Sequence, residues 1–349
     1  MKTKMTNKEY KGPILVISSF FIGVVVGILV LSNFIPKGNN TNDITKSIKK
    51  VKDAVVTIET RNGSVRESTG TGFVYKTTLN KAYLITNQHV VDNLGVTVIN
   101  SKGEETEGTV IGSDAKLDIA IVEIPKKYAL KKVTFGSSDK VEIGEEIFTI
   151  GSPMGREYAG TVTMGIISGK ERKVPTVMED YNEWYMNVLQ FDANINPGSS
   201  GGPLFNKDGE VIGVCVMKLI QNEIEGMGFA IPIEQVKTYL DTLEKGKDIE
   251  WPELGIAMVE VGNVAELNSR GITVPEDIYS GIVVLEIKEN SNADNKLKVG
   301  DIITKIDNEE ISESSEVKYA LMTHKKGDTI TIKVIRNGKE KNINITLIR

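Results

Sequence analysis

The residues with the clearest capacity for chemistry lie between positions 190 and 204, in the segment QFDANINPGSSGGPL. The hydroxyl of Ser200 stands there among glycines, after a proline that stiffens the approach. Gly198, Gly201 and Gly202 lack a Cβ atom, so the backbone can adopt positive φ and turn its N–H groups towards a developing oxyanion. A plain surface turn is the alternative, and a phosphate-binding loop is disfavoured because a strand pattern follows instead of a helix. The segment therefore predicts a serine nucleophile on a tight loop.

A general base for this serine must come from one of the two histidines in the chain. His89 follows the apolar strand pattern of AYLITNQHVVDN, whereas His324 lies in the turn-like segment THKKGD, where we expect a solvated side chain. Asp118 leads directly into the apolar run IAIVEI, and a buried carboxylate there needs a partner such as an imidazole N–H. Asp114 in the turn GSDAK is the alternative carboxylate, and we expect it to be solvated. Histidine, aspartate and serine in this chain order are typical of chymotrypsin-like acyl transfer.

The segments that must position these three residues are rich in Val, Ile and Thr, and their pattern predicts many short strands. Gly, Asn and Asp turns separate them, and this spacing predicts closed or sandwiched antiparallel sheets in an all-β domain. An amphipathic helix in IPIEQVKTYLDTLEKGK, with Gly246 near its end, is expected to close this domain. The expected strands lie at residues 54–60, 71–76, 82–87, 96–100, 108–112, 119–124, 146–152 and 161–168.

The N-terminal stretch predicts a membrane anchor. Four lysines and one glutamate precede Gly12, and no charged residue then occurs as far as Pro36. At about 1.5 Å per residue this run reaches about 35 Å, enough to cross a bilayer core of about 30 Å. We expect a cytoplasmic N-terminus at 1–12, a transmembrane helix at 13–36, a polar linker at 37–47 and all later domains outside the membrane. A cleaved signal peptide is the alternative, but its apolar region would be shorter.

Composition argues against several other classes of function. The net charge of −5 gives no electrostatic reason to expect a nucleic-acid partner. The single cysteine, Cys215, cannot form an intrachain disulfide, and its apolar surroundings in VIGVCVM indicate a small buried core residue. No cluster of Cys, His and Asp has the spacing of a metal site and no cofactor motif is found, so neither a metal nor a cofactor is expected.

Four motifs give the chain a resemblance to the HtrA (Deg) family of trypsin-like serine proteases. They are TNQHVV around His89, LDIAIVEI around Asp118, INPGSSGGPLFNKDGEVIGV around Ser200 and GMGFAIPI at 226–233. The resemblance implies a chymotrypsin-like fold, a double six-stranded barrel at residues 48–245. One departure concerns Ser199, since asparagine is usual before the nucleophile in this family. Two adjacent hydroxyls could then act, and alignment of the pattern Gly-x-Ser-Gly-Gly selects Ser200.

The resemblance also implies roles for individual residues. Neutral His89 would take the proton of Ser200 as the hydroxyl attacks a peptide carbonyl, while Asp118 would orient the imidazole and stabilise its cation. The turn made of Gly198, Ser199 and Ser200 would form the oxyanion hole, with the backbone N–H groups of its first and last residues as donors.

The family pocket for the side chain before the cut bond corresponds in part to Ile195, Met227 and Phe229. Because these side chains are apolar, small aliphatic side chains such as valine or alanine are the expected preference. Core packing is the alternative role for each of the three. The resemblance further implies that mobile loops at 169–187 and 217–227, and not cleavage of a precursor, set the active state.

The part from residue 253 to 349, which follows a linker at 246–252, resembles a PDZ domain, an α+β fold. The segment LKVGDIITKIDNEEI is its most specific part, and a helix is expected at about residues 314–322. In such domains a peptide adds to a sheet edge and its C-terminal carboxylate binds backbone N–H groups. These groups correspond here to Leu254, Gly255 and Ile256.

Together these features predict an ATP-independent serine endopeptidase that is anchored in the membrane, faces outward and cuts misfolded or exported proteins. Unfolded polypeptides and C-terminal peptides are the expected partners, and the resemblance implies a homotrimer or a larger assembly. The alternative function is a PDZ-dependent stress sensor or a chaperone-like binder with limited proteolysis.

Overall fold

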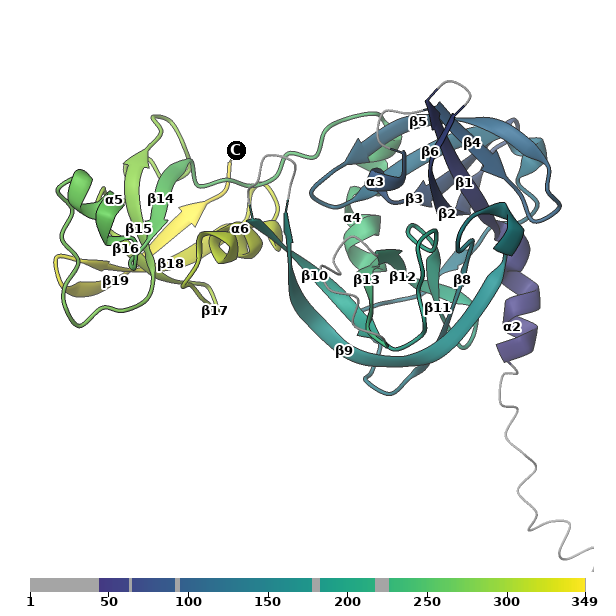
Figure 1. Cartoon of the computed structure of the whole chain (residues 1–349). Helices are drawn as coiled ribbons and strands as arrows, with labels where there is room; N and C mark the ends of the chain where they lie inside the picture. The colour runs from purple at the N-terminus through teal and green to yellow at the C-terminus, as the bar shows by residue number, and fades with distance from the viewer. Residues whose placement is uncertain (1–43, 63–64, 92–94, 178–182, 217–225, 349) are drawn as a thin grey trace, which may run out of the picture. The chain divides into compact units, whose positions relative to one another are not determined.

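The computed structural model describes residues 44–62, 65–91, 95–177, 183–216 and 226–348 (Figure 1). Tertiary contacts divide the chain into two units, Met1–Asp43 and Ile44–Arg349. The transmembrane helix predicted at 13–36 lies outside the described residues. None of the helices within the described ranges has the length and apolar character that crossing a membrane would require.

The first six strands form a closed barrel (Figure 1). They are β1 (Val55–Asn62), β2 (Val65–Thr77), β3 (Lys81–Thr86), β4 (Gly95–Ile99), β5 (Glu105–Asp114) and β6 (Ile119–Pro125). Their order is β1-β2-β3-β6-β5-β4, and β1 pairs with both β2 and β4 to close the ring. Because successive side chains of a strand point to opposite faces, alternate apolar residues meet inside the barrel. Ile58, Val74, Leu84, Val98 and Val122 are among the buried residues of this core.

The following strands form a second ring. They are β7 (Thr134–Phe135), β8 (Glu146–Gly151), β9 (Thr161–Val177), β10 (Glu183–Phe191), β11 (Pro203–Asn206), β12 (Glu210–Val216) and β13 (Gly228–Pro232). Their order is β11-β8-β9-β10-β13-β12-β7, and an additional pairing of β11 with β12 joins six of them into a ring. Phe148 and Phe205 stack in its core with their ring centroids 4.9 Å apart. The predicted β-rich double barrel is thus observed, with the short strand β7 added in parallel to β12.

Strands β9 and β10 extend further than the sequence indicates. Residues 169–187 carry no clear strand pattern and are expected to form a loop, but β9 and β10 stay paired as far as Val177 with Glu183. The expectation of a loop is therefore wrong for the described part of this segment. Glu171, Arg172 and Lys173 are all exposed, so both faces of β9 meet solvent there and no apolar alternation marks the strand.

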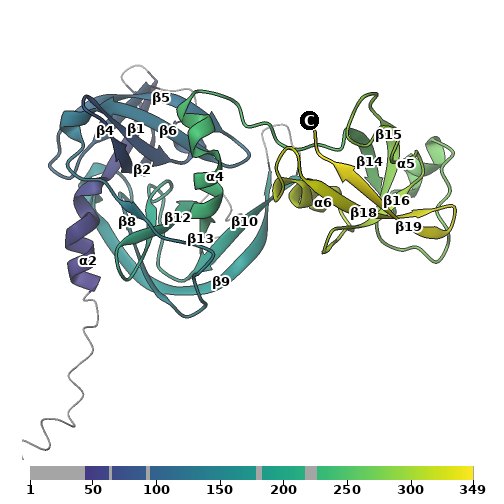
Figure 2. The same ribbon diagram turned by 180° about the vertical axis from the view of Figure 1, so that it is seen from behind.

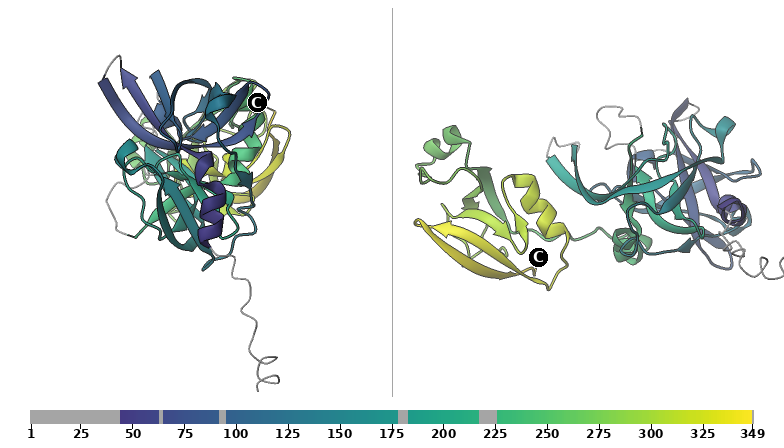
Figure 3. Two further views of the ribbon diagram at one scale, coloured as in Figure 1. Left: turned by 90° about the vertical axis from the view of Figure 1, so that its right-hand side faces the viewer. Right: turned by 90° about the horizontal axis from the view of Figure 1, so that it is seen from below.

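Among the residues that the structure describes, three α-helices accompany the barrels: α2 (Ile44–Val51), α3 (Gln88–Val91) and α4 (Ile233–Glu244). Helix α2, drawn in purple (Figure 3, left), begins before the expected domain start at residue 48. The Ser47 hydroxyl donates to the Lys207 carbonyl at 2.7 Å. Helix α4 confirms the predicted amphipathic helix and lies beside β12 and β13 (Figure 2). Short 3-10 turns are η1 (Lys52–Ala54), η2 (Lys126–Tyr128) and η3 (Arg156–Tyr158).

The C-terminal domain is an α+β unit. Its elements are β14 (Ile256–Glu260), α5 (Val264–Ser269), β15 (Ile282–Ile287), β16 (Ile302–Ile306), β17 (Glu309–Glu310), α6 (Ser314–Met322), β18 (Thr329–Arg336) and β19 (Lys339–Thr346). The sheet order is β14-β15-β16-β18-β19, with β17 paired to β16. Helix α6 matches the predicted bounds and packs Val317, Ala320 and Leu321 into the core of this domain. Among the described strands β14 pairs only with β15, so its other side is a sheet edge.

The environment of His324 differs from the solvated turn expected for it. Its Nε2 lies 3.1 Å from Asp307 Oδ2, and its Nδ1 lies 2.9 Å from the Ala320 carbonyl. The ring therefore connects the end of α6 to the turn between β16 and β17. No local sequence pattern reveals this contact, because the two segments meet only in the folded domain.

Candidate active site

His89 and Asp118 are brought together by α3 and the turn that precedes β6. The imidazole Nδ1 lies 2.8 Å from Asp118 Oδ2, and the His89 backbone N–H donates to Oδ1 at 3.0 Å. Asp118 is 3% exposed, so the predicted pairing of a buried carboxylate with an imidazole is observed. With its proton on Nδ1, the neutral ring presents Nε2 as a hydrogen-bond acceptor, which is the state a general base needs.

The turn that presents Asp118 is strained and is held by several polar groups. Asp118 has a φ of +53°, a region that costs a non-glycine residue about 1–3 kcal/mol. Asn87 Nδ2 donates to the Asp118 carbonyl at 2.8 Å. Asp114 accepts the Leu117 N–H at 2.7 Å and the Trp251 Nε1–H at 2.9 Å. Asp114 is therefore not the solvated residue that the sequence suggests, because its carboxylate braces the turn leading to Asp118.

The loop of Ser200 packs against the end of β3, just before His89. Gly201 has a φ of +81°, and an added Cβ would lie 2.3 Å from Thr86 Oγ1 and 2.9 Å from the Asn87 nitrogen. Only glycine allows this approach, both by its conformation and by its size. Ser200 is 6% exposed beside this contact. The three segments that carry His89, Asp118 and Ser200 therefore meet at one place in the fold.

Both the backbone N–H and the hydroxyl oxygen of Ser199 form hydrogen bonds within the turn. Its backbone N–H donates to the Asn196 carbonyl at 2.8 Å, and its Oγ accepts the Asn196 N–H at 3.3 Å. The inclusion of Ser199 in the oxyanion hole does not fit this geometry, because its amide hydrogen already has an acceptor within the turn. The engaged hydroxyl of Ser199 also favours Ser200 as the nucleophile.

Hydrogen bonds to the carbonyl groups of Pro197 and Gly198 fix the orientation of the Gly198 backbone. Gly198 has a φ of +100°. The Pro197 carbonyl accepts the Met154 N–H at 2.8 Å. Because a trans peptide directs its N–H away from its C=O, the Gly198 N–H points away from the Met154 backbone. On the next peptide, Thr71 Oγ1 donates to the Gly198 carbonyl at 2.6 Å, and the Thr71 N–H donates to the Ser200 carbonyl at 2.8 Å. The Gly198 N–H is thereby held in one direction, as an oxyanion donor must be.

The backbone of Cys215 supports the same loop from β12. Its carbonyl accepts the Gly201 N–H at 2.9 Å, and its N–H donates to the Gly202 carbonyl at 2.8 Å. Burial raises the pKa of the Cys215 thiol to about 12, so the thiol stays protonated. The interpretation of this residue as a small core residue is confirmed.

The residues expected in the substrate pocket lie in two apolar clusters. Phe229 is 8% exposed and, with half-buried Met227, packs in the cluster that contains Phe148. Half-buried Ile195 packs against a second cluster that contains Phe191. All three side chains thus pack against the core, while Ile195 and Met227 remain partly exposed.

In the C-terminal domain, the segment expected to bind a carboxylate leads into the edge strand β14. Leu254 is 2% exposed, and Ile256 is the first residue of the strand. Gly255 has a φ of +73°, and an added Cβ would lie 2.4 Å from Ser291 Cβ. Both the conformation and the space at this turn therefore require glycine.

Sequence reasoning missed the residues that hold these turns in place. Thr71 and Asn87 are fully buried polar residues inside apolar strand segments, and this unusual placement is a signal that could have identified them. Met154 acts through its backbone N–H, which no side-chain pattern reveals. Within the described ranges no group of three or more His, Cys, Asp and Glu side chains could hold a metal ion.

Two family models match the chain. A trypsin-like peptidase domain matches residues 70–214, and a PDZ domain matches residues 252–347. The first match contains the three residues chosen for catalysis, and the second begins within the predicted linker.

Several relatives and a solved structure match most of the chain. The serine protease Do-like HtrB of Bacillus subtilis (strain 168) is 38% identical, over 89% of this chain and 72% of that protein. The serine protease Do-like HtrA of Lactococcus lactis subsp. cremoris (strain MG1363) is 33% identical, over 88% of this chain and 83% of that protein. The structure of the HtrA-type protease AlgW with a decapeptide superposes with a TM-score of 0.64 and 26% identity, over 87% of this chain and 98% of that chain.

Proposed function

Because the chain belongs to the HtrA family of serine proteases, we propose that it degrades misfolded exported proteins on the outer side of a membrane. The protein is a serine endopeptidase with a trypsin-like domain and one PDZ domain. The residues that carry out the chemistry, the side of the membrane and the state of assembly are the parts of the proposal that need testing.

We propose that Ser200, His89 and Asp118 perform acyl transfer. His89 Nε2 takes the proton of the Ser200 hydroxyl as its Oγ attacks the peptide carbonyl, and the carbonyl oxygen becomes an oxyanion. The N–H groups of Gly198 and Ser200 stabilise that oxyanion, and His89 then protonates the leaving amine. A water molecule, deprotonated by His89 in turn, hydrolyses the acyl-enzyme and restores the serine hydroxyl.

The bond between His89 and Asp118 is the observation that carries this proposal. Both His89 Nδ1, at 2.8 Å, and the His89 backbone N–H, at 3.0 Å, engage the same buried carboxylate. This arrangement fixes the tautomer and the direction of the ring. A structural histidine would not need a buried carboxylate on a strained turn beside a serine loop.

Digestion of fluorescein-labelled casein by the purified full-length chain tests the assignment. Ser200→Ala should lower turnover by about 10⁶-fold, because the nucleophile is lost. Ser199→Ala is the matched control, and it should retain most of the activity because the Ser199 hydroxyl is engaged with Asn196. Equal digestion by Ser200→Ala and the unaltered chain would end the assignment of Ser200.

We propose further that the pocket before the cut bond prefers small aliphatic side chains. The apolar character of Ile195, Met227 and Phe229 supports this preference. A peptide library should be cut mainly after valine or alanine, and cleavage mainly after lysine or arginine would refute the preference.

The PDZ domain binds peptides or unfolded proteins, and we propose that it recognises a free C-terminal carboxylate at Leu254, Gly255 and Ile256. The glycine turn that opens the edge strand β14 supports this site. A peptide with a free C-terminus should bind more tightly than its amidated form in fluorescence polarisation. Equal affinities would exclude carboxylate recognition.

Membrane anchoring by residues 13–36 and assembly into a homotrimer or larger form complete the proposal. The apolar run between two polar segments supports the anchor. The full-length chain should fractionate with membranes and should be digested by protease added outside intact cells. Recovery in the soluble fraction would contradict the anchor, and a monomer in sedimentation analysis would contradict the assembly.

A further inference from the structure

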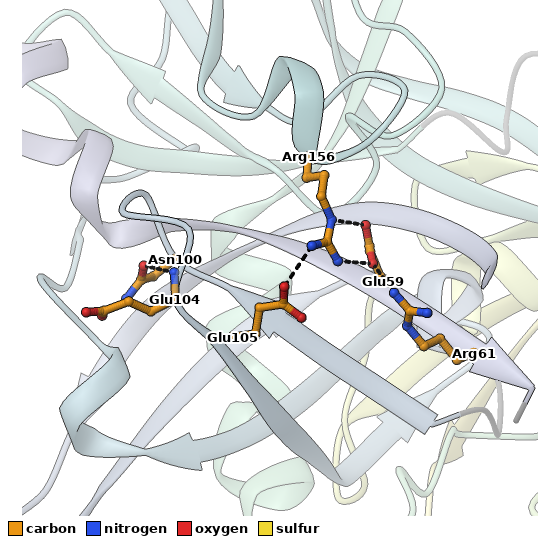
Figure 4. A network of polar contacts seen from close by, with 6 residues as sticks. All are labelled: Glu59, Arg61, Asn100, Glu104, Glu105 and Arg156. Carbon is orange, nitrogen blue, oxygen red and sulfur yellow. Dashed lines mark hydrogen bonds and ion pairs between the residues drawn. The ribbon is translucent and has the colours of Figure 1, made fainter. Parts of the chain in front are cut away.

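An ion pair between the exposed side chain of Arg156 and the buried carboxylate of Glu59 joins the loop between β8 and β9 to the first barrel (Figure 4). Arg156 donates to the Glu59 carboxylate from Nε at 3.0 Å and from Nη2 at 2.7 Å. Glu59 on β1 is 0% exposed. Arg61, also on β1, donates to Glu59 at 2.9 Å, and Glu105 accepts a further bond from Arg156 at 2.7 Å.

The Glu59 carboxylate is ionised and holds Arg156 at a fixed point. Hydrogen bonds from the Arg156 guanidinium lower the pKa of Glu59 to about 2. The planar fork of an arginine matches both oxygens of a carboxylate, so the pair fixes orientation as well as distance. Strand β1 is itself paired on both sides, to β2 and to β4, so the anchor point is part of a closed sheet.

The anchored loop touches the turn that carries Gly198. Met154, two residues before Arg156, donates its N–H to the Pro197 carbonyl at 2.8 Å. An added Cβ at Gly198 would lie 2.4 Å from the Ser152 carbonyl oxygen and 3.0 Å from the Met154 nitrogen. The two turns are therefore in direct backbone contact, and a shift of one loop must move the other.

The loop between β8 and β9 is strained, so its conformation depends on anchors. Met154 has a φ of +57° and Gly155 a φ of +105°. A non-glycine residue keeps a positive φ only when surrounding contacts offset the strain. Ser152 Oγ, 2.6 Å from Thr57 Oγ1, holds the start of the loop, and Arg156 holds its far side. The N–H that orients the Pro197 carbonyl lies between these two anchors.

We propose that Arg156 is a positioning residue for the oxyanion hole, acting through Glu59 and the backbone N–H of Met154. This inference rests on the proposed role of Gly198 as an oxyanion donor. Without the guanidinium, the strained loop relaxes, the Pro197 carbonyl loses its donor and the peptide before Gly198 can rotate. The chemical step then slows, whereas binding of the substrate, which does not require that N–H, changes little.

The test uses the full-length chain and an internally quenched peptide with valine before the cut bond. Arg156→Met should lower kcat by about 100-fold, the scale of losing one oxyanion donor, with KM changed less than about twofold. A peptide boronate of the same sequence, which forms a tetrahedral adduct, should bind more weakly by a similar factor. Arg156→Lys keeps a positive charge near Glu59 but lacks the planar guanidinium fork. Its kcat should therefore lie between that of Arg156→Met and that of the unaltered chain.

Arg61→Met is the matched control, because Arg61 donates to the same carboxylate but belongs to β1 and does not hold the loop. Its kcat should stay within about twofold of the unaltered chain, the size expected for a half-exposed ion pair. Circular dichroism establishes that each variant is folded at the assay temperature.

Two results would overturn the positioning role. One is a folded Arg156→Met chain with unaltered kcat and boronate affinity, and the other is an equal loss of kcat in Arg61→Met. Ser200→Ala, assayed in parallel, separates this inference from the proposed function. Full activity of Ser200→Ala rejects the proposed catalytic serine, whereas inactive Ser200→Ala beside fully active Arg156→Met rejects the role of Arg156 alone.

Discussion

At the scale of single residues, Thr71 connects several backbone groups around the proposed nucleophile, Ser200. Its Oγ1 donates to the Gly198 carbonyl at 2.6 Å and accepts the Ser152 N–H at 2.9 Å. Its backbone N–H donates to the Ser200 carbonyl at 2.8 Å. Because Thr71 is fully buried, water cannot replace the bonds of its hydroxyl. One side chain of the first barrel thus holds two turns of the second.

Thr71→Val should show how much this hydroxyl contributes. The change preserves the volume of the side chain but removes the partner of two buried backbone groups, at a cost of about 1–3 kcal/mol for each group in the free energy of unfolding. We expect kcat to fall about tenfold, because the Gly198 peptide is held less firmly. Urea unfolding and peptide cleavage measure the two effects. Thr71→Ser keeps the hydroxyl and should recover most of kcat, and a poor recovery would assign the loss to packing.

At the scale of elements, α4 meets β5 at a point where only glycine fits. An added Cβ at Gly112 would lie 2.1 Å from the Leu243 carbonyl oxygen, which belongs to the last turn of α4. The Tyr75 hydroxyl donates to Glu244 at 2.9 Å at the same end of the helix. The helix therefore lies on the first barrel as well as on β12 and β13 of the second.

Gly112→Ala should move α4 away from β5 and lower the free energy of unfolding by about 1–3 kcal/mol. The φ of Gly112 is not positive, so the effect comes from the contact and not from backbone conformation. Gly95→Ala in β4 is the control, since the nearest atom to its added Cβ is the Arg61 carbonyl oxygen at an ordinary 3.5 Å. In urea denaturation, the free energy of unfolding of Gly95→Ala should lie within about 0.5 kcal/mol of that of the unaltered chain. Similar midpoints for both variants would exclude the steric explanation.

At the scale of the whole molecule, ionised glutamates join distant parts of the protease domain. Hydrogen bonds from Arg156 lower the pKa of Glu59 to about 2 and join β1 to the loop after β8. Burial alone would raise the pKa of Glu234 on α4, but bonds from Ser138 and Lys237 outweigh it and lower the pKa to about 2. Both carboxylates stabilise the fold only while they are charged.

The domain should therefore lose stability in acid. A carboxylate whose folded pKa lies below its unfolded pKa stabilises the fold fully above the unfolded value of 4.5, and this contribution is lost as the pH falls towards about 2. Urea unfolding at several pH values between about 2 and 6 should give a free energy that declines in this window. Glu59→Gln should have a shallower decline than Glu142→Gln, whose side chain is exposed. Identical slopes for these two variants would show that Glu59 does not contribute.

Much of the fold and of the site could be predicted because the signals are local. Alternation of apolar residues predicts strands, and the helix predicted at 314–322 has the observed bounds. Predictions failed where a segment has no such alternation or where its partner is far away in the chain. The exposed part of β9 has charged residues on both faces, and Asp114 is braced by Trp251, 137 positions further on.

The sequence by itself indicated the three residues proposed for catalysis and their order along the chain, since His89 and Asp118 follow from residue type and neighbouring pattern and the family resemblance selects Ser200 over Ser199. Only the tertiary structure decided how the turns around them are held. Ser199 is excluded as an amide donor by a bond inside its turn, and Arg156 reaches Glu59 across 97 positions. The physical reason is that side-chain patterns report which face of an element is buried. Hydrogen bonds between turns depend on how two closed barrels bring distant backbones together.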